Sequence, residues 1–147
     1  MNAPPFHTLL PRAERAGIYH LPYATDLALE EATESLGYAL LRLDLARITD
    51  KDGFLAAIGK TLEFPDWYGH NWDALADCLN DMSWLEADGY VLVLDHADAF
   101  AAANPADFGT ALSILQEASD AWREEGIPFW TLVGITADGI AWLRDLE

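Results

Sequence analysis

The sequence is poor in basic residues and in cysteine: it has 8 Lys and Arg against 25 Asp and Glu, and one cysteine, Cys78. Because nucleic-acid binders and proteins that bind anionic membranes need clustered Lys and Arg, the net charge of −17 argues against both classes. A single thiol cannot form an internal disulfide, which suits a reducing compartment. The longest apolar runs, around Tyr90–Leu94 and Phe129–Ile135, are far shorter than the roughly 20 residues of a membrane span. The first residues also lack the basic start and apolar run of a signal peptide. We therefore expect a soluble cytoplasmic protein.

The length and the apolar content indicate one packed domain. The chain has 147 residues, of which 52% are apolar, including six Trp. Domains usually have about 100–200 residues, so a second independent core is not expected. The apolar fraction supports a packed interior in spite of the high net charge.

Strand-like and helix-like patterns alternate along the chain. We expect three core strands, at Tyr38–Leu45, Tyr90–Leu94 and Phe129–Ile135, and a short strand at Gly17–Leu21 that either adds a fourth strand or covers an edge. Residues 1–16 are typical of an arm or edge segment. Helices are expected over Asp26–Ser35, from Thr49 or Asp50 to before Pro65, and over Trp72–Asp81, Ala97–Ala102, Asp107–Glu125 and Ala137–Leu146. Strands separated by helices favour crossover connections, so the predicted fold is a single α/β domain with a small parallel sheet flanked by helices.

Negative charge is concentrated in the middle of the chain. From Thr61 to Trp122 there are 12 carboxylates and no Lys or Arg. An acidic surface without counter-ions from its own segment favours a basic partner.

Asp73 and Asp77 lie within a predicted helix over Trp72–Asp81, for which Asn71 is a suitable N-cap. Helical spacing separates an inward face from an outward face that carries Asp73, Ala76, Asp77 and Asn80. The helix dipole favours Asp73 in the first turn, but Asp77 lies beyond it and next to a like charge. We interpret Asp77 as a binding residue, with an ordinary solvated acidic face as the alternative.

An aromatic loop precedes this helix. Trp67, Tyr68, Gly69 and His70 place two rings and a flexible glycine beside the acidic helix. Rigid rings that exclude water around charge pairs are typical of protein interfaces. The alternative is that the rings cover the edge of the core, which we expect for at least one of them.

The segment PDWYGHNWDALADCL, from Pro65 to Leu79, resembles the hallmark of the barstar family of ribonuclease inhibitors. An aromatic residue, Tyr-Gly, Asn, Asp-Ala-Leu and Asp-Cys-Leu occur in the family's order. The resemblance covers residues 37–135, leaving 1–36 as an N-terminal extension packed on the domain and 136–147 as a C-terminal tail. It implies a barstar-like fold, and an inhibitor that occludes the active site of a small basic ribonuclease, or a similar cationic nuclease toxin, with the helix after Asn71 and the adjoining loop.

The resemblance also implies roles for single residues. Asp77 matches the acid that takes the place of substrate phosphate, and Asp73 matches a second contacting acid. The match departs from the family at Ala76, where barstar has a tryptophan, and at Ala121, where it has a glutamate, so the contact surface is trimmed. The expected partner-binding residues are Trp67, Tyr68, Gly69, Asn71, Asp73, Ala76, Asp77, Trp84 and Glu125.

Two other functions compete with this one. An enzyme has thin support, because Cys78 is expected to point inward without a base and the histidines, His7, His20, His70 and His96, match no metal-ligand spacing. Asp95 and Asp98 flank His96 after a predicted strand, which is the place where an α/β protein would hold a ligand. We expect no catalytic residue, metal or cofactor. The other alternative is an adaptor or immunity protein that has the same fold and binds another basic protein without inhibiting a ribonuclease.

Overall fold

The central element is a parallel sheet whose strands have the order β2-β3-β4-β1-β5. The computed structural model describes residues 6–21, 26–135 and 144–145. The strands are β1 (Ile18–His20), β2 (Ala39–Asp44), β3 (Tyr90–Asp95), β4 (Phe129–Val133) and β5 (Arg144–Asp145). The helices are α1 (Phe6–Leu9), α2 (Asp26–Leu36), α3 (Lys51–Thr61), α4 (Trp72–Asp81), α5 (Asp98–Ala103) and α6 (Pro105–Glu124), with a 3₁₀ turn at Ala13–Arg15.

The predicted α/β fold is confirmed. The three core strands are β2, β3 and β4, and the short N-terminal strand joins the sheet because β1 pairs with β4, with Ile18 opposite Thr131. Residues 6–16, expected as an arm or edge segment, form α1 and a 3₁₀ turn. One expectation at the end of the chain was wrong. Arg144 and Asp145, expected in a helix, form β5 beside β1, while residues 136–143 and 146–147 of that tail lie outside the described residues.

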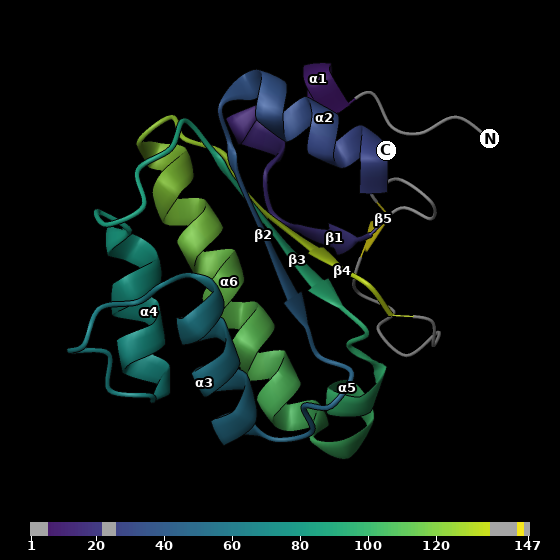
Figure 1. Ribbon diagram of the computed structural model, residues 1–147, viewed down its shortest axis with the longest axis vertical. Helices are drawn as coiled ribbons and strands as arrows, with labels where there is room; N and C mark the ends of the chain where they lie inside the picture. The colour runs from purple at the N-terminus through teal and green to yellow at the C-terminus, as the bar shows by residue number, and fades with distance from the viewer. Residues whose placement is uncertain (1–5, 22–25, 136–143, 146–147) are drawn as a thin grey trace.

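The direction of the crossovers explains why helices lie on both faces of the sheet. The chain moves from β2 to β3 to β4 in one direction across the sheet, and from β1 to β2 in the other. Because parallel crossovers are almost always right-handed, opposite directions place the connecting helices on opposite faces. Figure 1 shows α3, α4, α5 and α6 on one side of the strands and α1 and α2 on the other.

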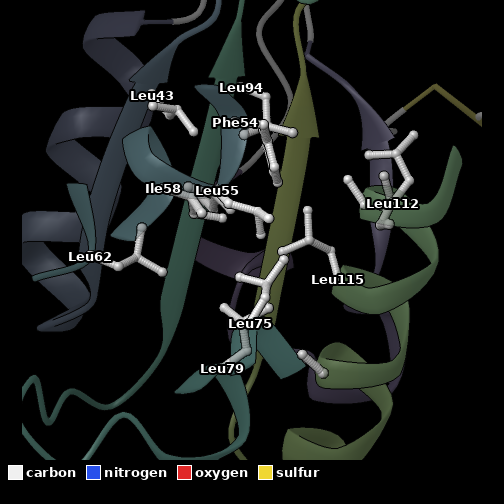
Figure 2. Packing of buried hydrophobic residues seen from close by; sticks show 14 of the residues in the cluster. Leu43, Phe54, Leu55, Ile58, Leu62, Leu75, Leu79, Leu94, Leu112 and Leu115 are labelled. Carbon is white, nitrogen blue, oxygen red and sulfur yellow. The ribbon is translucent and has the colours of Figure 1, made fainter. Parts of the chain in front are cut away.

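Each face of the sheet buries its own apolar cluster. Successive residues of a strand point to opposite faces, so Leu92 and Leu94 of β3 belong to one cluster and Val91 and Val93 to the other. The larger cluster joins the sheet to α3, α4, α5 and α6. Figure 2 shows its residues from β2, β3, α3, α4 and α6, among them Phe54. The smaller cluster joins the sheet to α1 and α2. The helix that carries the candidate site is thus anchored in the larger core.

Polar bonds also attach the N-terminal residues to the last helix and strand. The Trp130 indole N–H donates to the carbonyl oxygen of Leu10 at 3.0 Å. Arg123, at the end of α6, donates to the carbonyl oxygens of Ala13 and Ala16 at 3.3 and 2.8 Å. These bonds satisfy groups that are largely removed from water.

The longest helix begins two residues before its predicted start. Pro105 is the first residue of α6, a position where the missing N–H has no helical partner. Gly126 follows the helix with a φ of 75°, as a helix stop requires. Within the described part of the chain, no helix is long and apolar enough to cross a membrane.

Candidate functional site

Helix α4 spans Trp72–Asp81 and has Asn71 as its N-cap, as predicted. Asn71 has an extended backbone, and its side-chain oxygen accepts a hydrogen bond from the Ala74 N–H at 2.8 Å. Met82 ends the helix in the left-handed conformation, with a φ of 51°, and its N–H donates to the carbonyl oxygen of Cys78. Leu75, Cys78 and Leu79 are buried. This fixed inward face determines which side of α4 meets solvent.

Asp73 and Asp77 lie on the solvent side of α4. Both are exposed, and among the described residues neither carboxylate takes part in a hydrogen bond or an ion pair. Asp81 continues the same side one turn later and accepts a bond from the Ser83 N–H at 3.3 Å. Because residues four apart on a helix are neighbours, the three carboxylates form a row along α4. Two of them are therefore available to a partner.

The wider acidic segment is partly neutralised from outside. Arg42 of β2 donates to both carboxylate oxygens of Asp95, at 3.0 and 3.2 Å, and Arg123 pairs with Asp120 at 2.9 Å. Both bases come from beyond the acidic segment, because the sheet register and α6 bring them beside these two carboxylates. The N-terminal end of α4 also has a cation nearby, because the Lys51 ammonium lies 5.5 Å from the centre of the Trp72 ring.

The two aromatic residues of the preceding loop have different environments. Trp67 is 58% exposed and contacts Trp84 edge to face, with ring centres 6.2 Å apart. Trp84 is half-buried and its indole N–H donates to the Leu62 carbonyl at 3.0 Å. The structure thus brings Trp67 and Trp84 together, and Trp84 supports the exposed ring from beneath.

Tyr68, by contrast, faces the core. It is 6% exposed, its hydroxyl donates to the Leu55 carbonyl at 2.9 Å, and burial raises its pKa. Its ring lies against α3 at Gly59, where an added Cβ would come within 2.7 Å of a ring carbon. Rings of Phe64 and His70 pack beside it, with centres 4.8 and 4.6 Å away. Tyr68 therefore holds the loop in place.

Sequence reasoning missed this close contact at Gly59. The signal that points to it is a glycine inside an otherwise regular helical pattern, which usually marks a close approach. Gly69 is the residue of the loop for which a left-handed backbone would be easiest, but His70 adopts that conformation instead, with a φ of 55°.

The remaining expected residues surround α4. Ala76 is half-buried on the helix. Glu125 is exposed directly after α6, at the end of that helix that adjoins the C-terminal end of α4. The Trp122 indole N–H donates to the Leu79 carbonyl at 2.8 Å and joins the two helix ends. Glu125 thus lies toward the Asp81 end of the row, away from the loop.

His96 and Cys78 are two of the groups considered for an enzyme, and their surroundings differ. The His96 ring and the Asp44 carboxylate are exposed and 2.9 Å apart, and this bond raises the pKa of His96. Cys78 is fully buried, and burial together with the nearby carboxylate of Asp77 raises the pKa of its thiol to about 11. Within residues 6–21 and 26–135, no three His, Cys, Asp or Glu side chains are grouped so that they could hold a metal ion.

Comparison with known proteins gives a match over the part of the chain that holds this surface. A family model described as Barstar (barnase inhibitor) matches residues 38–134. The matched range contains β2, β3, β4 and helices α3 to α6, and begins after α1, β1 and α2. A comparison with curated proteins found no match.

Proposed function

Because the chain belongs to the barstar family, we propose that it binds a small basic ribonuclease, or a similarly cationic nuclease toxin, and occludes the active site of that enzyme. The binding surface consists of α4 and the loop Trp67–Asn71. The observation that carries this proposal is the pair of exposed carboxylates, Asp73 and Asp77, which have no partner among the described residues. The protein acts by binding rather than by catalysis.

Charge accounts for the encounter with a basic enzyme. A net charge of −17 attracts a cationic protein over several ångströms and speeds its association, more so at low salt. Once docked, Asp77 would accept charge-assisted hydrogen bonds from the arginines that normally bind substrate phosphate. Such hydrogen bonds slow dissociation of the complex only if the surrounding surface excludes water.

The aromatic loop supplies that surface. Trp67 is the exposed large ring beside α4, and a rigid aromatic side chain gives contact area with little loss of entropy. Tyr68 and Trp84 fix the loop before the partner arrives, so little reorganisation is needed on binding. Gly69, Asn71 and Ala76 complete the proposed contact surface, with Glu125 at its periphery.

The trimmed surface favours a second candidate function. Ala76 and Ala121 lack the ring and the charge that the family pattern has there. A barstar-fold immunity or adaptor protein that binds another basic protein, without inhibiting a ribonuclease, would keep the carboxylates of α4 and lose those contacts. The two functions differ in whether the bound enzyme still cleaves RNA.

Binding and inhibition of barnase and a panel of other small basic ribonucleases test the proposal. Asp77→Ala should weaken binding at least about 30-fold, because truncating a buried charge pair costs upwards of about 2 kcal/mol. Glu31→Ala, which removes one exposed charge from α2 on the opposite face, is the matched control and should change affinity less than about 2-fold. Failure of every ribonuclease to bind, or equal effects of the two variants, would overturn the proposal. Binding without inhibition would favour the adaptor.

A further inference from the structure

A cleft of about 270 Å³ lies where α4 ends, beside the last turn of α6. The exposed residues Asp81 and Glu86 line it, Trp122 is its partly exposed ring, and the buried residues Tyr90 and Met82 form its floor. Figure 1 shows α4 and α6 side by side, and the bond from Trp122 to Leu79 holds their ends together. Since Asp81 follows Asp77 by one helical turn, the cleft continues the row of carboxylates on α4.

The hydrogen-bonding groups of the cleft select the kind of ligand. The indole N–H of Trp122 is used by Leu79, and the hydroxyl of Tyr90 donates to the Leu85 carbonyl at 2.7 Å. Trp122 therefore offers ring surface, and neither aromatic residue has a free donor. Among the described residues the Glu86 carboxylate has no hydrogen-bond or ion-pair partner, so it is available as an acceptor. The Asp81 carboxylate accepts one hydrogen bond, from the Ser83 N–H, and can accept others.

No basic side chain among the described residues fills the cleft. Arg123 follows Trp122 in sequence, but its guanidinium is bound to Asp120 and to carbonyl oxygens of Ala13 and Ala16. The residues from Thr61 to Trp122 contain no Lys or Arg. The negative charge at this end of α4 is thus not balanced from its own segment.

Carboxylates beside an accessible aromatic ring suit a guanidinium. Its planar group stacks on a ring and at the same time presents several N–H donors to carboxylates, which a lysine ammonium does less well. We propose that the cleft receives an arginine side chain of the basic protein that docks on α4, as a second anchor about one helical turn beyond Asp77. This inference rests on the proposed function for the identity of the partner, and the charge complementarity of the cleft carries it.

A small probe tests the cleft without the partner. N-acetyl-arginine amide, titrated into the full chain, should cause saturable NMR shifts at the Trp122 indole N–H and the Ser83 and Glu86 amides. N-acetyl-citrulline amide, which has nearly the same shape but no charge, should shift these signals by less than about a tenth as much. Equal effects of the two compounds, or shifts that do not saturate, would overturn the proposal.

Variants separate the cleft from general acidity. Glu86→Gln and Asp81→Asn should each weaken the arginine probe at least about 5-fold, because each removes one charged acceptor. Glu31→Gln, on the opposite face, should leave binding of the probe unchanged. All three are changes at exposed positions and should keep the thermal midpoint of the parent protein within about 2 °C. An unchanged probe affinity in Glu86→Gln and Asp81→Asn would reject the cleft as the binding site.

The partner distinguishes this inference from the proposed function. For a ribonuclease whose binding is lost in Asp77→Ala, Glu86→Gln should lower affinity about 5-fold or more. If Asp77→Ala abolishes binding and Glu86→Gln is silent, the second anchor is wrong and the proposed function stands. If the arginine probe binds the cleft while no ribonuclease binds the protein, the proposed function is wrong and the cleft stands as an arginine site.

Discussion

The contact between Gly59 and Tyr68 predicts opposite effects for one chemical change made in two helices. Gly59→Ala in α3 and Gly109→Ala in α6 each replace a helical glycine by the best helix former, a gain of about 1 kcal/mol in helix propensity. An added Cβ at Gly109 would meet nothing within 4 Å. At Gly59 it would lie 2.7 and 3.0 Å from two carbons of the Tyr68 ring. Gly109→Ala should therefore stabilise the protein, and Gly59→Ala should not.

The size of this difference in stability follows from the overlap between the added Cβ and the Tyr68 ring. Non-bonded carbon atoms prefer separations of about 3.5–4.0 Å, so the Tyr68 ring would have to move by about 1 Å. The ring has little freedom, because its hydroxyl is bonded to Leu55 and Phe64 and His70 pack beside it. Overpacking of this kind costs about 1–3 kcal/mol. The propensity gain is common to both variants, so their free energies of unfolding should differ by about 1–3 kcal/mol.

Urea denaturation of the two variants and the parent protein measures this difference. At about 2–4 °C per kcal/mol, thermal midpoints should separate in the same order. A double-mutant cycle with Tyr68→Leu isolates the contact, because the penalty of Gly59→Ala should largely disappear when the ring is absent. If Gly59→Ala stabilises as much as Gly109→Ala, the ring is not held against α3, and the loop beside α4 lacks the support described above.

Three further predictions concern single groups around the site. Because burial raises the pKa of the Cys78 thiol to about 11, the native protein should react with a thiol reagent only as fast as it unfolds, and rapid modification would contradict this. The pKa of His96 is raised by Asp44, so their bond stabilises the fold fully below the ordinary histidine pKa of about 6.5 and loses this effect as pH rises through the raised pKa. Asp44→Asn should return the His96 titration, followed by NMR, toward its ordinary value; an unchanged titration would exclude Asp44 as the cause. Asn71→Ala should lower the free energy of unfolding by about 1 kcal/mol through loss of the N-cap, while Asn71→Asp should keep most of it, and equal losses in urea would refute the capping role.

Local features of the sequence determined α4 and the side of it that faces solvent. The cap at Asn71 acts within three residues, and the spacing of Leu75 and Leu79 defines a buried face whatever they pack against. β3 and β4 were likewise predictable, because continuous apolar runs are typical of strands buried on both faces, and β2 was predictable from the alternation of Leu41 and Leu43 with Arg42 and Asp44. The order of residues from Pro65 to Leu79 was enough to indicate the family that the match over residues 38–134 shows.

Only the tertiary structure decided how distant segments meet. Trp67 and Tyr68 are adjacent aromatic residues, and nothing local distinguishes the exposed ring from the one held against Gly59. The pairing of Arg42 with Asp95 depends on the register of β2 against β3, and the cleft beside Trp122 depends on how α6 lies against α4. β5 forms because β1 presents a free edge to it, which overrides the helical pattern of its own residues. Caps and periodicity act over a few residues, whereas contacts between elements depend on the packing of the whole core.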